Sequence, residues 1–434
     1  MSGHDNSATF GGARPLRGRL RLPGDKSLSH RALLFAALAR GASRVANLAP
    51  GEDVAATRAI LEQLGVRCRA GEGLTVAGSG FDGLREADGV LDCANSGTTM
   101  RTLTGLLAGR QFLSVLTGDG SLRKRPMARV VDPLRAMGAA IDGRDGGRLA
   151  PLVVRGGSLR ATDIVLPVAS AQVKSALVLA ALQADGPCSI ASPELTRDHT
   201  ERMLDALGAP VRTDGLVVHV EPLTDPWAGF DLTVPGDPSS AAFFAVAATI
   251  TPGSEIVLDD VAINPTRIGF VDVLQRMGAD ITVEHTHDVL GEPVGTIGVR
   301  SAALRATAMR GAEIPSIIDE IPVLAIAAAF ADGVTEIRDA EELAVKETNR
   351  IGAVQQELQQ LGIGCEAHRD GLTIRGGAPR AGSQLKSHGD HRMAMAAAVA
   401  AHALDGESTV RGWAAVRVSY PQFADDLAVL TGAS

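Results

Sequence analysis

Two kinds of helix-length hydrophobic pattern alternate along the chain. In Glu52–Gly65 the apolar residues, including Ile60 and Leu64, fall on one helical face, and polar residues cover the other. Segments 200–208 and 268–278 repeat this amphipathic pattern. Each of the three ends in a glycine, which is typical of the residue that terminates an α-helix. The pattern predicts half-buried helices that each lead into a short strand.

The second pattern is apolar on nearly every side and rich in small residues. A helix without a polar face is buried, so we expect these segments to form buried helices. Short strands should alternate with both kinds of helix. The apolar segments are 28–40, 96–108, 173–183, 240–250, 321–331 and 393–402.

A helix end followed by Leu-Gly or Met-Gly recurs along the whole chain. The leading residues are numbers 64, 137, 207, 277 and 361, and a truncated copy stands at Leu430-Thr431-Gly432. Steps of roughly 70 to 84 residues are too long for a solenoid repeat but suit a unit of two helices and several strands. We therefore expect six such units, packed as two layered α/β domains of three units each.

Clusters of helix-breaking residues suggest where these domains divide. Pro235-Gly236-Asp237-Pro238 lies midway along the chain, and Pro23-Gly24 lies near its start. We expect an N-terminal domain over residues 24–238. The C-terminal domain would comprise residues 1–23 and 239–434, with the early stretch Leu16–Leu22 packed against the second half.

Composition narrows the possible functions of this 434-residue chain. Its aromatic content of 3% and net charge of −8 argue against nucleic-acid and membrane surfaces. The longest apolar runs are too short to span a membrane, and the first ten residues do not resemble a signal peptide. The four cysteines are far apart, which fits free thiols in a reducing cytoplasm.

Polar groups stand at the starts of several apolar segments, where free backbone amides and the helix dipole attract anions. Lys26 and Ser27 open the first segment, and Arg31 lies one turn further along the same face as Ser27. A nucleotide-binding P-loop is not predicted, because Asp25 stands where that motif needs glycine. Similar candidates near other segment starts are Gly97 within Asn95–Arg101, Arg125, Ser170, Gln172, His391 and Arg392.

Carboxylates form a second kind of candidate. Asp319 and Glu320 directly precede an apolar segment. A carboxylate against apolar surface tends to have a raised pKa, which suits proton transfer. Further along, Lys346 and Arg350 have the spacing of one helical face, and Glu347 has the spacing to pair with Arg350.

Each motif alone is also typical of an ordinary helix cap or a solvated charge cluster. A metal site at His388 and His391 is not predicted, because no third ligand stands nearby. The motifs together place more cationic and hydroxyl groups at buried helix starts than chance should. From the residues alone we predict a cleft between the two domains that binds small molecules carrying several negative charges.

In their order along the chain, these motifs resemble those of the enolpyruvyl transferases, and in particular the branch that acts on shikimate 3-phosphate. The matching strings run from residue 22 to residue 395, so the resemblance covers nearly the whole chain. The strings are Leu22-Pro23-Gly24-Asp25-Lys26-Ser27, Asn95-Ser96-Gly97-Thr98-Thr99-Met100-Arg101, Arg125-Pro126, Ser170-Ala171-Gln172, Val345-Lys346-Glu347-Thr348-Asn349-Arg350 and Asp390-His391-Arg392-Met393-Ala394-Met395.

The resemblance implies a fold and a reaction. The fold is the inverse α/β barrel of this family, with two domains of three βαβαββ-like units each and the active site between them. In the reaction, the enolpyruvyl group of phosphoenolpyruvate passes to the 5-hydroxyl of shikimate 3-phosphate, and phosphate is released. This step belongs to the shikimate pathway of chorismate and aromatic amino-acid biosynthesis. The resemblance also implies a cytoplasmic enzyme without metal or other cofactor, and we expect a monomer.

The resemblance further implies roles for single residues. Asp319 would accept the proton of the attacking hydroxyl, while Glu347 and Lys26 would handle the proton at the methylene carbon. The implied ligands of shikimate 3-phosphate are Lys26, Ser27, Arg31, Ser170, Gln172, Arg197, Asp319 and Lys346. The implied ligands of phosphoenolpyruvate are Lys26, Gly97, Arg125, Gln172, Arg350, His391 and Arg392.

Some positions depart from one common version of the family. Ala171 replaces a frequent serine, and Asn349 replaces a frequent aspartate. The string Thr196–Thr200 matches a different branch, in which Arg197 replaces a serine as phosphate ligand. Near the end of the chain, Val418 occupies a lysine position, for which Arg417 is a possible substitute.

Two alternative functions remain to be separated from this one. The sister transferase acts on UDP-N-acetylglucosamine and typically carries Lys-Asn near its start and a reactive cysteine on a mobile loop. This chain has Lys26-Ser27 at the first position and no cysteine in the comparable loop, Thr117–Pro126. The other alternative is a catalytically silent binding protein of the same fold. The joint presence of the proposed cationic and acidic residues argues against it.

Overall fold

The computed structural model describes residues 6–432, and the chain divides into two compact units. The N-terminal unit comprises Gly24–Val234 and the short segment Asp288–Glu292. The C-terminal unit comprises the described residues up to Pro23, residues 235–287 and the described residues from 293 onward. The division at Val234 falls four residues before the expected boundary at 238. Gly236 already lies in the C-terminal unit, where its amide donates to Asp260 O at 2.7 Å.

Each unit contains three small sheets, and among the described residues five sheets have four strands and one has three. In each four-stranded sheet one edge strand is parallel to its neighbour, and that neighbour is antiparallel to the next strand. The sheet β6-β7-β9-β8 shows the rule, with α3 before β7 and α4 before β8, which is the order βαβαββ. The bounds are β6 Leu91–Asp92, α3 Gly97–Ala108, β7 Leu113–Thr117, α4 Ala128–Ala136, β8 Ala140–Arg144 and β9 Leu149–Arg155.

The other two sheets of the N-terminal unit follow the same rule. Their strand orders are β10-β11-β13-β12 and β14-β3-β5-β4. One group is β10 Asp163–Val165, α5 Ala171–Ala181, β11 Cys188–Ala191, α6 His199–Ala206, β12 Val211–Asp214 and β13 Val217–Val220. The other is β14 Asp231–Thr233, α1 Lys26–Leu38, β3 Arg40–Ala46, α2 Glu52–Gln63, β4 Arg67–Gly71 and β5 Gly73–Ser79.

The C-terminal unit repeats the arrangement with sheets β16-β17-β15-β2, β18-β19-β21-β20 and β1-β23-β22. The first sheet contains β2 Arg17–Arg21, β15 Glu255–Ala262, β16 Asp280–Val289 and β17 Glu292–Arg300, with helices α7 Pro238–Ile250 and α8 Gly269–Arg276. The second contains β18 Ala308–Met309, β19 Val334–Ile337, β20 Gly364–His368 and β21 Gly371–Arg375, with helices α9 Ile314–Ile317, α10 Ile321–Ala329 and α11 Arg350–Gln360. The third contains β1 Ser7–Gly11, β22 Gln384–Lys386 and β23 Glu407–Arg411, with helices α12 His391–His402 and α13 Phe423–Thr431.

The strand that precedes the first helix of each unit belongs to a sheet of the other unit. Strand β2 directly precedes α1, yet it pairs in parallel with β15 of the C-terminal unit. Strand β14 directly precedes α7, yet it pairs in parallel with β3 of the N-terminal unit. The exchange takes the chain from one unit to the other at Pro23-Gly24 and back at Val234-Pro235, apart from the short excursion of Asp288–Glu292 into the N-terminal unit. Both crossings coincide with the helix-breaking residues of the sequence.

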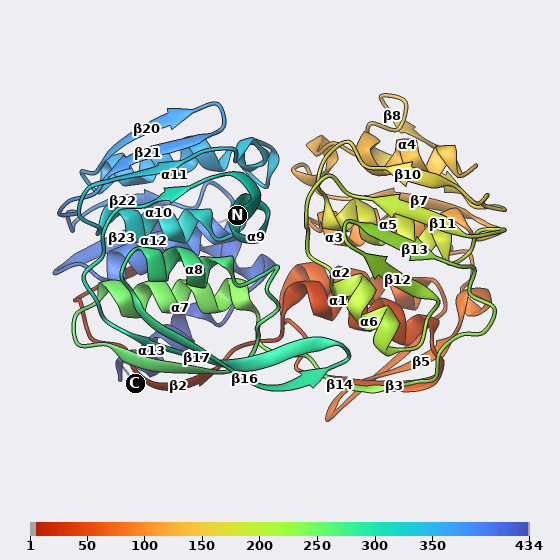
Figure 1. Ribbon diagram of the computed structural model, residues 1–434, viewed down its shortest axis with the longest axis horizontal. Coiled ribbons are helices and arrows are strands. Elements are labelled where there is room, and N and C mark those ends of the chain that lie inside the picture. Colours follow the sequence, from red (N-terminus) through yellow and green to blue (C-terminus); the bar gives the residue numbers. More distant parts are fainter. Residues whose placement is uncertain (1–5, 433–434) are drawn as a thin grey trace. The chain divides into compact units, whose positions relative to one another are not determined.

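The six apolar segments form the buried helices α1, α3, α5, α7, α10 and α12, which confirms the hydrophobic-pattern prediction. Every residue of α7, α10 and α12 is buried. Figure 1 shows these three helices in the middle of the C-terminal unit, with β20 and β21 on one side and β2 and β16 on the other. In the N-terminal unit α3 and α5 cross closely, because a Cβ at Gly105 would lie 2.0 Å from the carbonyl oxygen of Ala176.

The recurrent helix-ending glycines have the expected left-handed conformation. Their φ angles are +93° at Gly65, +99° at Gly138, +76° at Gly208, +96° at Gly278 and +79° at Gly362. A side chain would be strained at such angles, so glycine ends each helix and turns the chain into the next strand. Among the residues that the structure describes, no helix combines the length and apolar character needed to cross a membrane.

Candidate active site

In the N-terminal unit, the first candidate residues stand at the beginning of α1. Asp25 caps the helix, with its Oδ1 accepting a hydrogen bond from the amide of Leu28 at 2.6 Å. The Nζ of Lys26 lies 3.0 Å from Asp53 Oδ2, a buried carboxylate of α2. The Lys26 ammonium is therefore fixed at the start of α1.

Arg31 connects α1 to two other helices. Its Nε donates to Thr200 Oγ1 at 2.7 Å in α6, and its Nη2 donates to Ser175 Oγ at 2.6 Å in α5. Its Nη1 donates to the carbonyl oxygen of Ser27 at 2.9 Å. Burial lowers the pKa of Arg31 to about 10, although the nearby carboxylates oppose this shift. The guanidinium therefore remains a cation at neutral pH.

Gly97, Gln172 and Arg125 gather around the start of α3. Arg101 Nη1 donates to Gln172 Oε1, and Gln172 Nε2 donates to Thr98 Oγ1 at 2.9 Å. A Cβ at Gly97 would lie 2.8 Å from Arg101 Nη1 and 3.4 Å from Arg125 Nη1. The glycine thus leaves the space that lets two guanidinium groups approach the helix start.

The remaining candidates of this unit begin α5 and precede α6. Ser170 caps α5, with its Oγ accepting from the amide of Val173 at 3.4 Å. Arg197 stands two residues before α6, and its positive charge contributes to the lowered pKa of Arg31. The structure therefore collects the candidates of the N-terminal unit at the starts of α1, α3, α5 and α6.

In the C-terminal unit, Arg350 is surrounded by three carboxylates. Its Nε donates to Asp390 Oδ2 at 2.8 Å, its Nη2 to Glu347 Oε2 at 2.7 Å and its Nη1 to Asp319 Oδ1 at 3.1 Å. Burial lowers the pKa of Arg350, but the charges of Asp390, Glu347 and Asp319 outweigh burial and raise the pKa above its ordinary value. These contacts bring together residues of three separate sequence motifs, Asp319, the pair Glu347 and Arg350, and Asp390.

Asp319 is also in contact with two other cationic candidates. Lys346 Nζ lies 3.5 Å from Asp319 Oδ1, and Arg392 Nη1 donates to the carbonyl oxygen of Asp319 at 3.1 Å. The expected helical face shared by Lys346 and Arg350 is wrong, because α11 begins only at Arg350. Asn349 instead caps α11, and the non-helical residues before it bring Lys346 to Asp319.

Arg392 and His391 open α12, and Asp390 caps it as expected. The Oδ1 of Asp390 accepts from the amide of Arg392 at 2.8 Å, while His391 is 2% exposed. Arg417 lies in a short 3-10 helix and is exposed to solvent.

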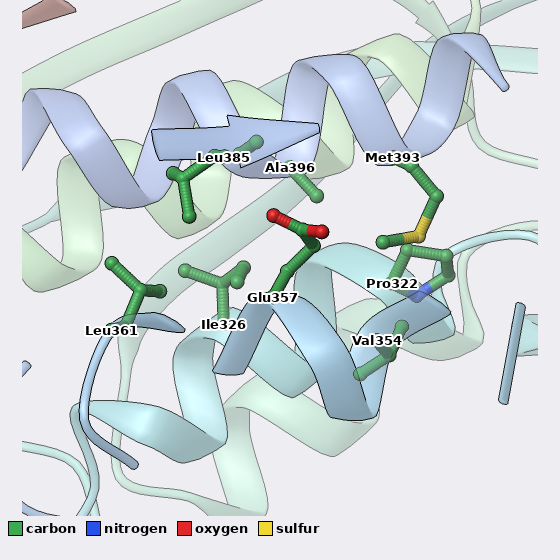
Figure 2. Close-up of a pocket in the computed structure, with 9 residues that line it drawn as sticks. Pro322, Ile326, Val354, Glu357, Leu361, Leu385, Met393 and Ala396 are labelled. Atoms are coloured by element: carbon green, nitrogen blue, oxygen red, sulfur yellow. The ribbon is translucent and has the colours of Figure 1, made fainter. Parts of the chain in front are cut away.

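The segment that leads to Asp390 is secured by Glu357, a buried residue of α11. Glu357 accepts from the amide of Lys386 at 2.8 Å, and its other oxygen lies 2.6 Å from His388 Nε2. Figure 2 shows the Glu357 carboxylate among apolar side chains that line a small pocket, including Ile326 and Met393. Because Arg350 opens the same helix α11, Glu357 holds the Asp390 segment against the helix that carries Arg350.

Several supporting residues were missed in the sequence. Ser239 of α7 lies 3.4 Å from Arg392 Nη2, and its Oγ donates to the buried Glu320 at 2.5 Å. Arg267, only 2% exposed, donates to the same Ser239 Oγ at 3.1 Å. One signal was available, since Pro-Gly-Asp precedes α7 at 235–237 and also precedes α1 at 23–25.

Comparison with solved structures places the fold among those of the enolpyruvyl transferases. An EPSP synthase from Acinetobacter baumannii superimposes with a TM-score of 0.87 at 41% identity, covering 98% of this chain and 97% of that one. The enolpyruvyl transferase NikO from Streptomyces tendae has a TM-score of 0.79 at 19% identity, over 97% and 96% of the two chains, so it shares the fold.

Sequence comparison identifies the family itself. The family model for EPSP synthase (3-phosphoshikimate 1-carboxyvinyltransferase) matches residues 11–427. A 3-phosphoshikimate 1-carboxyvinyltransferase from Shouchella clausii is 50% identical over 413 residues, covering 95% of this chain and 96% of the relative. Its counterpart from Desulforudis audaxviator is 52% identical over 417 residues, covering 96% and 97%. The chain belongs to the EPSP synthase family, which confirms the resemblance seen in the motifs.

Proposed function

We propose that the protein transfers the enolpyruvyl group of phosphoenolpyruvate to the 5-hydroxyl of shikimate 3-phosphate and releases phosphate, as a step of the shikimate pathway. The observation that carries this proposal is the identity of about half of all positions, over nearly the full length, to relatives named for this activity. The fold, with its candidate residues gathered at helix starts in each unit, is consistent with it.

The N-terminal unit supplies most of the proposed ligands of shikimate 3-phosphate. Cations and hydroxyl groups at helix starts suit a phosphate group, because amides, dipole and side-chain charge all favour an anion there. Arg125, Gly97 and Gln172 would contact phosphoenolpyruvate, with Arg125 on its phosphate. The proposed ligands of shikimate 3-phosphate in this unit are Lys26, Ser27, Arg31, Ser170, Gln172 and Arg197.

The C-terminal unit supplies the proposed ligands of the phosphoenolpyruvate carboxylate. Arg350 and Arg392 would bind it, since a planar guanidinium pairs with a carboxylate through two parallel hydrogen bonds. Arg350 already contacts three carboxylates, so the substrate would replace one of them. If the substrate carboxylate takes the place of Glu347 or Asp319 on Arg350, the displaced side chain has an oxygen available for proton transfer. His391 would lie against phosphoenolpyruvate, and Lys346 and Asp319 against shikimate 3-phosphate.

The proposed chemistry is an addition followed by an elimination. Asp319 accepts the proton of the 5-hydroxyl while the hydroxyl oxygen bonds to the second carbon of phosphoenolpyruvate. Glu347 or Lys26 delivers a proton to the methylene carbon. A proton then leaves the resulting methyl group, the double bond forms again, and the C–O bond to phosphate breaks. Only the two substrates and these side chains take part in the steps as we propose them.

A phosphate-release assay separates this function from its alternatives. We expect release from phosphoenolpyruvate only when shikimate 3-phosphate is present. Release with UDP-N-acetylglucosamine would assign the protein to the sister activity, and release with neither acceptor would favour a silent binding protein. The sister transferase typically carries a reactive cysteine. In this chain burial raises the pKa of Cys68, Cys93, Cys188 and Cys365 and so disfavours the reactive thiolate, which argues against the sister activity.

We further propose that the protein acts in the cytoplasm as a monomer, without a nucleic-acid or membrane partner. The net charge of −8 disfavours polyanionic partners. Size-exclusion chromatography with light scattering tests the oligomeric state. A mass near 44.8 kDa is expected, and twice that value would contradict the monomer.

A further inference from the structure

The turn between β16 and β17 belongs to the N-terminal unit, although most of both strands belongs to the C-terminal unit. This turn, residues 288–292, is held by the first residues of α6. Glu292 Oε1 lies 2.8 Å from His199 Nδ1, and Arg202 Nη1 donates to the carbonyl oxygen of Gly291 at 3.3 Å. A short piece of the second half of the chain is therefore built into the N-terminal unit.

The contact between His199 and Glu292 is buried on both sides. His199 is 0% exposed and Glu292 is 1% exposed. A carboxylate only accepts hydrogen bonds, so Nδ1 of the histidine is the donor. Removing one member of a buried polar pair leaves the other unsatisfied, which makes such a contact a strict constraint on the position of the backbone. The pair therefore fixes the first turn of α6 against the β16–β17 turn.

That first turn carries much of the proposed site for shikimate 3-phosphate. Arg197, a proposed phosphate ligand, stands two residues before His199 in the sequence. Thr200, the next residue, accepts the hydrogen bond from Arg31 at 2.7 Å. Glu201 then lies 2.6 Å from Lys174 of α5, and both are buried. A displacement of His199 would therefore move both Arg197 and Thr200, the hydrogen-bond partner of Arg31.

Glu292 also acts on Arg31 through its charge. It is one of the carboxylates that raise the pKa of Arg31 against the effect of burial, while Arg197 lowers it. Two arginines that converge on one phosphate repel each other when the site is empty. The negative charge of the buried Glu292 favours the charged form of Arg31 and so opposes that repulsion.

We infer that Glu292 and His199 are a positioning pair for shikimate 3-phosphate, holding the start of α6 so that Arg197 and Arg31 converge on its phosphate. The inference rests on the proposed function, because it takes that substrate as the ligand. It assigns a binding role to a turn outside the sequence motifs. It also gives a functional role to His199 and Thr200, two further residues of the Thr196–Thr200 string.

The test compares Glu292→Ala, Glu292→Gln and the wild-type protein by titration calorimetry with shikimate 3-phosphate and by steady-state kinetics. We expect Glu292→Ala to weaken shikimate 3-phosphate binding by about 10- to 100-fold, because misplacement of a binding group by about 1 Å has effects of that size. The KM for phosphoenolpyruvate should stay within about twofold. Glu292→Gln keeps an acceptor for His199 Nδ1 and should recover most of the affinity.

The controls separate positioning from general damage. Glu284→Ala changes an exposed carboxylate on the same hairpin and should leave both substrates unaffected. If Glu292→Ala does not fold, Glu292→Asp, which shortens the side chain by one methylene, should still weaken shikimate 3-phosphate binding in folded protein. Unchanged shikimate 3-phosphate binding in folded Glu292→Ala or Glu292→Asp, or equal increases in KM for both substrates, would overturn the inference.

The calorimetric experiment also distinguishes this inference from the proposed reaction. A wild-type protein that binds shikimate 3-phosphate but releases no phosphate would disprove the reaction, while the variants would still decide the role of Glu292. A wild-type protein that does not bind shikimate 3-phosphate would overturn both.

Discussion

Asp390 accepts a hydrogen bond from Nε of Arg350 at 2.8 Å, and the two side chains are 0% and 1% exposed. The other oxygen of the same carboxylate accepts from the backbone amide of Arg392 at 2.8 Å and so caps α12. One buried carboxylate therefore fixes the orientation of one arginine side chain and the helix start that carries another. The two proposed ligands of the phosphoenolpyruvate carboxylate are positioned by a residue that itself need not contact the substrate.

Replacing Asp390 by asparagine should damage stability and substrate binding together. The asparagine side chain would still cap α12, but it would leave the buried Arg350 without its strongest counter-charge. We expect Asp390→Asn to lower the free energy of unfolding by about 3 kcal/mol, as is typical when one member of a buried ion pair is neutralised. The KM for phosphoenolpyruvate should rise. Urea unfolding and steady-state kinetics measure the two effects, and an unchanged unfolding midpoint would contradict the role of Asp390.

Asp319 offers the clearest separation of chemistry from binding. If it accepts the hydroxyl proton, Asp319→Ala should lower kcat by roughly 10²- to 10⁴-fold, the usual contribution of a general base. The dissociation constant of shikimate 3-phosphate should change by only a few fold. Single-turnover kinetics with calorimetry measures both quantities. Equal losses in turnover and in binding would remove the assignment of Asp319 as the base.

Gly97 should be required for phosphoenolpyruvate binding rather than for folding. In Gly97→Ala the new methyl group would meet Arg101 Nη1 at 2.8 Å. A guanidinium at the end of a flexible side chain can move away, so the fold should survive. Its displacement would disturb the hydrogen bond to Gln172. We expect the KM for phosphoenolpyruvate to rise by about tenfold or more, with the melting temperature nearly unchanged.

The matched control for this substitution is Gly89→Ala. Gly89 is exposed, and a Cβ there would have no neighbour within 4 Å. It should leave both KM values and the melting temperature as in the wild type. If Gly97→Ala behaves in the same way, the start of α3 does not lie against phosphoenolpyruvate.

The fold was predictable wherever local pattern decides the structure. The buried helices follow from segments without a polar face, and the helix ends follow from glycines such as Gly65 and Gly278 that adopt positive φ. The contact of Glu292 with His199 was not predictable, because nothing in the local sequence shows where the tip of a hairpin will be bound. The placement of β2 in the C-terminal unit was anticipated from the breakers at Pro23-Gly24, but the pairing of β14 with β3 was not, because only tertiary pairing reveals it.

The candidate site shows the same limit. The motifs named Arg350, Asp319 and Glu347, but a sequence cannot show that one guanidinium contacts both of these carboxylates. The helical spacing of Lys346 and Arg350 was misleading, because the residues between them are not helical. Side-chain chemistry and the local pair of Glu347 with Arg350 could be anticipated, whereas the contacts of Arg350 with Asp319 and Asp390 join residues distant in sequence.

His30, in the helix that carries Lys26 and Arg31, should lower the stability of the folded protein in acid. It is 0% exposed, and its Nδ1 lies 2.7 Å from Thr57 Oγ1 of α2. Burial, followed by the charges of Lys26 and Arg31, lowers the pKa of His30 to about 3. The folded protein therefore holds the neutral imidazole, while the unfolded chain takes up a proton below its ordinary pKa of 6.5.

The sign of the effect follows from this difference. The contribution of His30 to stability is fully present above pH 6.5 and is lost as pH falls towards 3, by about 1.4 kcal/mol per pH unit. Urea unfolding at pH 7 and pH 5 should therefore show a loss about 2 kcal/mol larger in the wild type than in His30→Gln. His287→Gln, at an exposed histidine of β16, should lose as much as the wild type. A His30→Gln variant with the wild-type pH dependence would show that acid acts elsewhere, for instance at His402, whose pKa burial also lowers.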